Sequence, residues 1–186
     1  MRLGVLASGT GTILEALLDA GLDVSIVVVD RPCRAIEVAS AAGVPGVLVP
    51  RPSFGPAFDR VAYSKEVATV LLDNDVGLAA IAGFGTVLDA TFFDHFRSPV
   101  LNTHPSLLPS FKGWHAVDDA LAAGVKLSGC TVHIAVADVD AGPILAQEAV
   151  PVLPGDDAEA LHERIKAVER RLYPETIARF SRGELP

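Results

Sequence analysis

An asparagine and a histidine stand two residues apart after a short apolar run. The run covers residues 99–101, and the polar residues are Asn102 and His104. On an extended segment, side chains at positions i and i+2 point to the same side. A carboxamide can donate to a developing oxyanion, and an imidazole can move or stabilise a proton. The pair fits acyl transfer, but a loop with an unrelated Asn and His explains these residues equally well.

Two further features favour the chemical interpretation. Pro105 and Pro109 stiffen the segment that follows, since each fixes its own φ and lacks a hydrogen-bond donor. The segment also lies at the carboxyl end of a predicted strand, where open α/β sheets bind ligands. A third polar group, Asp140, follows in a loop that is equally unlike core sequence.

Strand-like and helix-like segments alternate along the chain, which predicts a doubly wound α/β fold with a mostly parallel, Rossmann-like sheet. The last two predicted strands are joined without a helix and can pair antiparallel. A long final helix closes the chain, and residues 1–186 are expected to form one domain. Strands are predicted at 2–7, 23–30, 47–49, 77–82, 99–101, 128–136 and 144–152, and helices at 13–20, 34–42, 58–72, 88–96, 116–123 and 156–182.

The composition narrows the function classes. Half of the 186 residues are apolar and the net charge is −8, which argues against general binding to nucleic acid or to anionic membranes. No apolar run approaches the roughly 20 residues of a membrane span. The two cysteines, Cys33 and Cys130, are too few for a disulfide framework. We therefore expect a cytoplasmic protein with reduced thiols.

A glycine-rich turn joins the first predicted strand to the first predicted helix. It reads Ser-Gly-Thr-Gly-Thr over residues 8–12, and Thr10 or Thr12 is expected to cap the helix. Free N–H groups and the helix dipole favour an anion there, most simply a phosphate. A tight turn that needs glycine and binds nothing is the alternative.

The same turn supports a second function class. Gly9 and Gly11 nearly match the dinucleotide fingerprint, and Asp30 ends the next strand where a ribose-binding acid would stand. The third glycine of that fingerprint is Leu14, however, and a nicotinamide-dependent oxidoreductase would leave Asn102 and His104 without a role. A non-catalytic nucleotide- or folate-binding module is a third alternative.

Taken together, five motifs resemble the phosphoribosylglycinamide formyltransferase family, the folate-dependent formyltransferases of purine synthesis. The resemblance covers nearly the whole chain and implies a Rossmann-like formyltransferase fold. Residues 1–100 would then form mainly the nucleotide-binding half, and residues 101–186 the catalytic and folate-binding half. The motifs are residues 8–12, 82–84, 102–109, 129–133 and 140–144.

The resemblance implies formyl transfer from 10-formyltetrahydrofolate to the amine of glycinamide ribonucleotide, with no metal. The partners would be these small molecules alone, and the protein a monomer or a homodimer. The implied catalytic residues are Asn102, His104 and Asp140. The implied nucleotide-binding residues are Gly11, Thr12, Ile13 and Glu169. The implied folate-binding residues are Arg60, Gly85, Thr86, Val87, Leu88, Val136, Ala137, Asp138, Val139 and Asp140.

The chain departs from the family pattern at several positions. Gly85 and Thr86 stand where the pattern has Met-Arg, so an arginine is missing beside the folate loop. Ile13 stands where the phosphate loop often has asparagine. Formyl transfer to another amine, such as an amino-sugar nucleotide, therefore remains an alternative.

Three further histidines are interpreted as structural. They are His95, His133 and His162, and His133 lies in the middle of a predicted strand. A buried strand histidine is more often a satisfied core imidazole than a ligand. No histidine has a metal-like spacing to cysteine or carboxylate, so no catalytic metal is expected.

Overall fold

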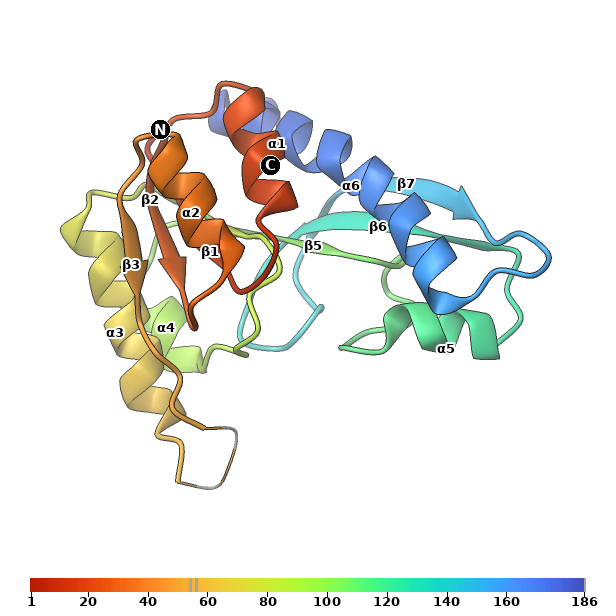
Figure 1. Ribbon diagram of the computed structural model, residues 1–186, viewed down its shortest axis with the longest axis horizontal. Helices are drawn as coiled ribbons and strands as arrows, with labels where there is room; N and C mark the ends of the chain where they lie inside the picture. Colours follow the sequence, from red (N-terminus) through yellow and green to blue (C-terminus); the bar gives the residue numbers. More distant parts are fainter. Residues whose placement is uncertain (54, 56, 186) are drawn as a thin grey trace. The chain divides into compact units, whose positions relative to one another are not determined.

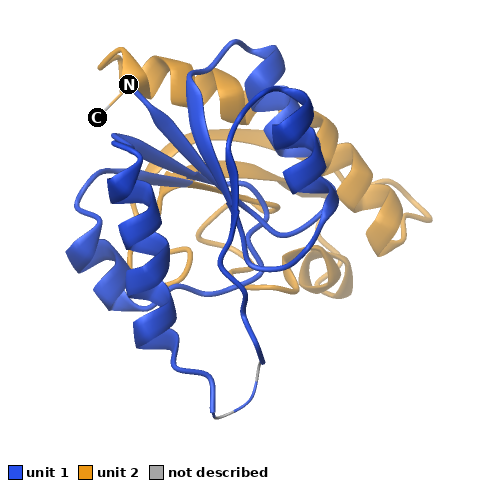
Figure 2. Ribbon diagram, turned by 60° about the vertical axis from the view of Figure 1, so that its left-hand side comes forward, with its two compact units in different colours: residues 1–101 blue, residues 102–186 orange. Residues whose placement is uncertain are grey.

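The computed structural model describes residues 1–53, 55 and 57–185. The chain divides into two compact units, residues 1–101 and residues 102–186 (Figure 2). The strands are β1 (Leu3–Ala7), β2 (Val24–Val29), β3 (Gly46–Leu48), β4 (Leu78–Ile81), β5 (Val100–His104), β6 (Leu127–Ile134) and β7 (Ile144–Pro151). The helices are α1 (Thr12–Asp19), α2 (Arg34–Ala41), α3 (Arg60–Asp73), α4 (Ala90–His95), α5 (Ala116–Ala122) and α6 (Ala158–Ser181).

The strand order of the sheet is β3-β2-β1-β4-β5-β6-β7. Strand β5 begins in the first unit and ends in the second. Strand β1 pairs in parallel with β2 and β4, whereas β6 pairs antiparallel with β7. The predicted fold class, a mostly parallel doubly wound sheet with an antiparallel C-terminal pair, is thereby confirmed.

In the first unit, helices cover both faces of the parallel strands. Figure 1 shows α1 and α2 on one face and α3 and α4 on the other. Every residue of β1 is buried, and so are the last four of β2. A strand covered on both faces must be apolar throughout, which explains the continuous runs LGVLA and IVVV.

Three helices begin at an aspartate that caps their first turn. The carboxylates of Asp59, Asp89 and Asp157 accept from backbone N–H groups at the starts of α3, α4 and α6. Helix α1 differs, because its N-cap is Gly11 in the left-handed conformation, φ 76°, with no side-chain cap. The expected cap by Thr10 or Thr12 is therefore wrong.

In the second unit, α5 and α6 pack on the β6–β7 pair. A cluster of buried side chains joins these four elements: Val117, Cys130, Val150, Leu161 and Ile165. Helix α6 is 24 residues long and contacts both strands (Figure 1). Its buried residues include Leu161, Ile165, Tyr173 and Ile177.

Each predicted element is present, and the boundaries differ by a few residues. Helix α3 begins at Arg60 instead of residue 58, because Asp59 caps it. Strand β5 continues to His104, so Asn102 and His104 lie within a strand and not beyond its end. The extension matters because strand geometry fixes these two side chains more tightly than a loop would.

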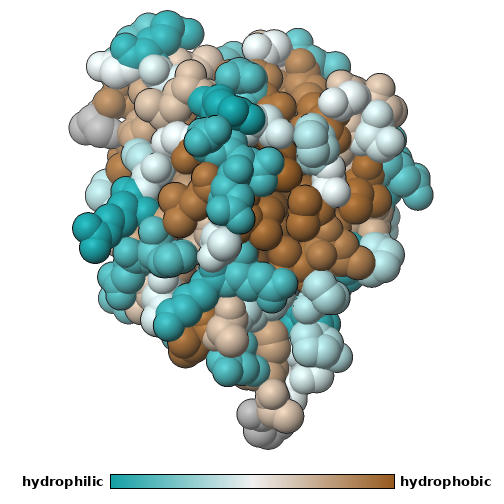
Figure 3. Space-filling model, turned by 90° about the vertical axis from the view of Figure 1, so that its left-hand side faces the viewer, coloured by the Kyte–Doolittle hydropathy of each residue, from teal (hydrophilic) through white to brown (hydrophobic). Residues whose placement is uncertain are grey.

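Some large apolar side chains of the first unit stay exposed, among them Leu48, Val61 and Leu72. Figure 3 shows hydrophobic areas interrupted by hydrophilic side chains on one face. Scattered exposure of this kind is ordinary for a folded protein. The monomer or homodimer expectation therefore stays a prediction. Among the described residues, no helix is long and apolar enough to span a bilayer.

Candidate active site

Strand β5 carries three consecutive polar residues that face two different environments. Asn102 and His104 point to one side, as their spacing predicts. Thr103 lies between them, and its hydroxyl is 3.3 Å from the Sγ of Cys130. His104 is buried and Asn102 is half-buried. Both are therefore largely withdrawn from bulk water.

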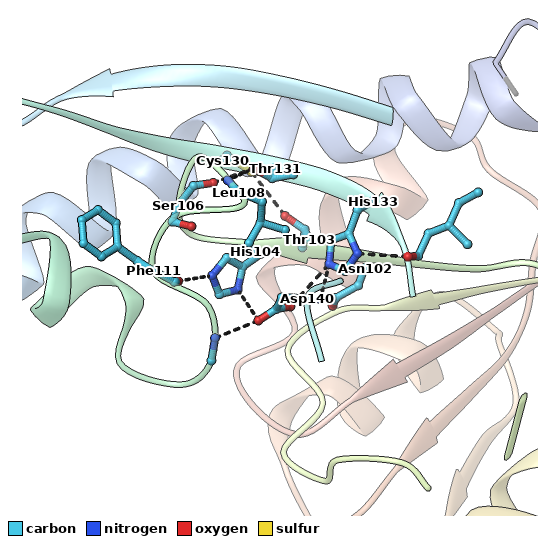
Figure 4. A network of polar contacts seen from close by, with 12 residues as sticks. Asn102, Thr103, His104, Ser106, Leu108, Phe111, Cys130, Thr131, His133 and Asp140 are labelled. Carbon is cyan, nitrogen blue, oxygen red and sulfur yellow. Dashed lines mark hydrogen bonds and ion pairs between the residues drawn. The ribbon is translucent and has the colours of Figure 1, made fainter. Parts of the chain in front are cut away.

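His104 is held at both ring nitrogens. Its Nε2 lies 2.7 Å from the carbonyl oxygen of Phe111, and its Nδ1 lies 3.3 Å from Oδ2 of Asp140 (Figure 4). A carbonyl oxygen only accepts, so Nε2 carries a hydrogen. Nδ1 is then the nitrogen that can gain or lose a proton, next to a carboxylate that stabilises the charged ring.

Two residues that contact His104 have unusual backbone conformations. Phe111 has φ 53° and Asp140 has φ 52°, in the left-handed region that residues with a Cβ rarely adopt. Gly113 N–H donates to Oδ2 of Asp140 over 2.9 Å. Strained backbone of this kind persists where the surroundings hold it, often at functional sites. Here it aims one carbonyl and one carboxylate at the same imidazole.

Asp140 stays ionised although it is only 9% exposed. Burial favours the neutral carboxyl group. Hydrogen bonds with His133 and from the Gly113 N–H, together with the charges of His104 and His133, outweigh burial and lower the pKa of Asp140 below its ordinary value. A buried carboxylate that remains charged can hold an imidazolium beside it.

His133 belongs to this network, which sequence reasoning missed. It is 1% exposed on β6, and its Nε2 lies 3.1 Å from Nδ2 of Asn102 and 3.5 Å from Oδ1 of Asp140 (Figure 4). The structural interpretation of His133 is therefore incomplete. Its position in the same motif as Gly129 was a usable signal, but only strand pairing reveals the contacts.

Glu169 faces the other side of strand β5. Burial is the main reason that the pKa of its carboxyl group is raised, and a hydrogen bond with the Thr103 hydroxyl lowers it in part. Thr103 also contacts the Cys130 thiol, whose pKa burial raises to about 12. Within the second unit, the structure thus brings Glu169 to the residue between Asn102 and His104.

A buried threonine holds the proline-bounded segment after β5. The Oγ1 of Thr131 donates to the Ser106 carbonyl over 2.6 Å and accepts from Leu108 N–H over 3.0 Å. Gln147 on β7 donates to Thr131 Oγ1 and to the Leu108 carbonyl, each over 2.9 Å. The segment that follows His104 is therefore fixed to strands β6 and β7.

The loop predicted to bind folate in the second unit is mostly exposed. Val136, Ala137, Asp138 and Val139 face solvent, and only Asp140 is buried. Exposed apolar side chains at Val136 and Val139 are available to a flat ligand. The loop thus combines an anchored carboxylate with an open surface.

In the first unit, the two glycine-rich loops are bonded to each other. Gly85 N–H donates to Ser8 Oγ over 2.5 Å, and Ser8 N–H donates to the Gly83 carbonyl over 3.1 Å. One loop follows β1 and the other follows the neighbouring strand β4. Residues predicted to bind phosphate and residues predicted to bind folate therefore share one edge of this unit.

Asp30 is the centre of a buried polar cluster beside these loops. Thr86 Oγ1 donates to its Oδ2 over 2.8 Å, and Arg31 Nε donates to its Oδ1 over 2.9 Å. Arg51 Nη2 lies 3.7 Å from Oδ2. Burial opposes the charge, but hydrogen bonds from Arg31, Ser8 and Thr86 lower the pKa of Asp30. A ribose-binding acid must present free oxygens, so this arrangement argues against the dinucleotide alternative.

The same cluster accounts for the departure at Gly85 and Thr86. A Cβ at position 85 would lie 2.2 Å from Arg31 Nη2 and 3.2 Å from Asp30 Oδ2. Glycine therefore leaves room for the Arg31 side chain. Thr86 is buried, and its hydroxyl donates to Asp30. Where the family pattern has an arginine on the loop, this chain has a buried hydroxyl and an arginine from the end of β2.

The remaining predicted residues lie in the first unit. Gly11, Thr12 and Ile13 form the start of α1, where the first N–H groups of a helix lack intrahelical acceptors. Arg60 is exposed at the start of α3, and its charge contributes to the lowered pKa of Asp89, after the hydrogen bonds from Thr91. The described residues hold no cluster of three or more potential metal ligands.

Sequence comparison shows which proteins share these features. The formyl transferase family matches residues 1–177. A phosphoribosylglycinamide formyltransferase of Mycobacterium tuberculosis is 50% identical over 182 residues, 95% of this chain and 83% of that protein. This chain belongs to the phosphoribosylglycinamide formyltransferase family. The resemblance inferred from the five motifs is confirmed, and the protein is a formyltransferase.

Solved structures of the family have the same fold. Glycinamide ribonucleotide transformylase 1 of Symbiobacterium toebii matches with a TM-score of 0.92 and 42% identity, covering 98% of this chain and 88% of that one. The enzyme of Anaplasma phagocytophilum gives 0.89 and 40%, with the same coverage. The human trifunctional purine biosynthetic protein adenosine-3 is 37% identical over 98% of this chain, which corresponds to 18% of its own length.

Proposed function

We propose that this protein transfers the formyl group of 10-formyltetrahydrofolate to the amine of glycinamide ribonucleotide. The observation that carries the proposal is the contact of Asp140 with His104, on the strand that also presents Asn102. The relatives named for this activity match nearly the whole chain. The two small molecules are the only partners we propose, and we place the reaction in the cytoplasm.

The reaction joins nitrogen to carbon and releases the folate. The neutral amine attacks the formyl carbon, and the carbonyl oxygen becomes negative as a tetrahedral intermediate forms. The bond from the formyl carbon to the folate nitrogen then breaks, and the amine proton ends on that nitrogen. Asn102 has a carboxamide that can donate to the oxyanion, an effect worth about 10²–10³-fold in rate for one donor.

His104 and Asp140 provide the proton handling. With Nε2–H on the Phe111 carbonyl, Nδ1 of His104 is the nitrogen that can carry the moving proton. The Asp140 carboxylate, 3.3 Å away, stabilises the imidazolium while it exists. A water molecule between this pair and the substrate is sufficient to relay the proton. General acid–base catalysis of this kind contributes about 10²–10⁴-fold.

The family resemblance implies the binding groups. We propose that the backbone at Gly11, Thr12 and Ile13 holds the ribose phosphate, and that Glu169 binds the same nucleotide. The support is the helix start at Gly11 and the placement of the Glu169 carboxyl group against Thr103. Arg60, residues 85–88 and residues 136–140 are proposed to contact the folate.

The test is a spectrophotometric assay with glycinamide ribonucleotide and 10-formyl-dideazafolate. The wild-type protein should release the deformylated folate, and His104→Asn should abolish the signal. His95→Gln is a matched control, because His95 is an exposed histidine of α4 whose Nε2 lies 3.4 Å from the Thr69 hydroxyl, outside this network. No turnover by a folded wild-type protein would reject the nucleotide assignment, and amino-sugar nucleotides would be tested next.

A further inference from the structure

His133 has one ring nitrogen anchored to its own strand and one directed at the proposed catalytic group. Nδ1 lies 3.1 Å from the carbonyl oxygen of Ile134. Nε2 faces Nδ2 of Asn102 at 3.1 Å and Oδ1 of Asp140 at 3.5 Å (Figure 4). The strand therefore restrains the ring at Nδ1, and Nε2 faces two of the three proposed catalytic side chains.

We propose that His133 is the positioning residue of this site: it fixes the carboxamide of Asn102 relative to the carboxylate of Asp140. This inference rests on the proposed function and adds a residue to it. The family resemblance assigned no role to His133, which the sequence alone suggests is a core imidazole.

The two partners of Nε2 have opposite hydrogen-bonding character. The amide NH₂ of Asn102 donates, and the Asp140 carboxylate accepts. Neutral His133, with its hydrogen on Nδ1, accepts from Asn102, whereas the charged ring donates to Asp140. In the first case one Asn102 N–H is held by His133, and the second N–H keeps a defined direction toward the transferring oxygen.

Position matters here because the Asn102 carboxamide must aim one N–H at the transferring oxygen. Among the described residues, the Asn102 carboxamide makes its side-chain hydrogen bond with His133, over 3.1 Å. An unrestrained carboxamide rotates about its last side-chain bond, so its N–H groups no longer point in one direction. A misplacement of about 1 Å costs roughly 10²-fold in rate.

Two substitutions distinguish the role of Nδ1 of His133 from the role of Nε2. Glutamine places an amide near the former Nε2, with one atom that donates and one that accepts. Asparagine places its amide near the former Nδ1, and reaches Ile134 but not Asn102. We expect kcat of His133→Asn to fall by about 10²-fold with both KM values within threefold, and kcat of His133→Gln to stay within about tenfold of wild type.

Equal losses in the two variants, or a loss that appears only in KM, would overturn the positioning role. If asparagine prevents folding at this buried position, His133→Met replaces it. Methionine fills much of the ring volume but cannot hold the Asn102 amide. Methionine with wild-type kcat contradicts the proposal in the same way.

A second measurement is independent of activity. The chain has two asparagines, Asn74 and Asn102, so asparagine labelled with ¹⁵N gives two side-chain amide pairs. Asn74 donates to the Val70 carbonyl over 2.8 Å and is the internal reference. In His133→Met, which keeps two asparagines, hydrogen exchange of the Asn102 amide should accelerate at least tenfold, with Asn74 unchanged; His133→Asn should show the same acceleration beside a third amide pair from position 133. His133→Gln should exchange like wild type.

The two measurements distinguish two kinds of failure. If the protein shows no turnover on glycinamide ribonucleotide but still shows the Asn102 exchange pattern, the proposed substrate is rejected and the positioning role of His133 is supported. Unchanged Asn102 exchange in a folded His133→Asn or His133→Met protein rejects the inference, whatever the substrate.

Discussion

The carboxylate of Asp140 lies 3.3 Å from Nδ1 of His104, while the Phe111 carbonyl lies 2.7 Å from Nε2 on the opposite side of the ring. Both acceptors belong to residues with positive φ. The imidazole is therefore held between a neutral acceptor and a charged one. This arrangement leaves a single nitrogen for proton exchange and places it against the negative charge that stabilises the result.

The first prediction concerns the pair as a unit. Asp140→Asn and His104→Asn should each lower kcat by about 10²–10⁴-fold, because each removes the same stabilised imidazolium. The double variant should be little worse than either single variant, since residues that act together are not additive. Steady-state kinetics of the three proteins measures this, and additive losses would show that the two residues act independently.

The second prediction concerns Glu169. Its folded-state pKa lies above the ordinary value of 4.5, chiefly because of burial. The folded protein therefore holds this proton more tightly than the unfolded chain, and stability falls as pH rises from about 4.5 through the raised pKa. Glu169→Gln cannot ionise, so its stability relative to wild type should increase across this range.

The same substitution should weaken nucleotide binding. We expect the KM for glycinamide ribonucleotide to rise about tenfold, as for one lost charged hydrogen bond. Thermal unfolding at pH 5 and pH 8 measures the stability effect, in which a gain of about 1 kcal/mol raises Tm by about 2–4 °C. A variant that is less stable at pH 8 and keeps the wild-type KM contradicts both parts.

The third prediction concerns acid stability at the start of α6. Arg164 donates to both carboxylate oxygens of Asp156, over 2.7 and 2.9 Å, and this lowers the pKa of Asp156 to about 2. The stabilisation is complete above the ordinary pKa of 3.8 and is lost as pH falls toward 2. Asp156→Asn should be less stable than wild type at pH 6 and equal to it near pH 2, by urea unfolding.

The fourth prediction concerns Gly142, in the loop that carries Asp140. A Cβ at this position would lie 1.8 Å from the backbone oxygen of Ile134, so the loop must move. Gly142→Ala should lose about 1–3 kcal/mol of stability and most of its activity. Gly9→Ala is the stability control, because a Cβ there has no neighbour within 4 Å. Equal unfolding free energies would show that the loop adapts freely.

The fifth prediction concerns Thr131. Replacing it with valine keeps the shape and removes one hydroxyl that serves Ser106, Leu108 and Gln147. Buried partners left unsatisfied cost about 1–3 kcal/mol, so Thr131→Val should be destabilised by that amount. Thr69→Val is the control, since Thr69 is an exposed helix residue that bonds to the Lys65 carbonyl. Chemical denaturation gives the free energy of unfolding of both variants, and an equal loss in the two would contradict the prediction.

The sequence by itself determined the fold class and the order of elements. Buried parallel strands require continuous apolar runs, and such runs are visible at residues 26–29 and 78–81 without any structure. The spacing of Asn102 and His104 also placed both side chains on one side, because alternation is a local property of an extended chain. The order and spacing of the five motifs identified the formyltransferase family.

Only the tertiary structure decided what each polar group contacts. His133 is 31 residues from Asn102 along the chain, and no periodicity reveals that β6 brings its Nε2 to the carboxamide. Asp30 had the position of a ribose ligand, but Arg31 and Thr86 occupy its oxygens. Hydrogen-bond partners depend on strand pairing and loop paths over long sequence separations, and local sequence patterns do not encode those distances.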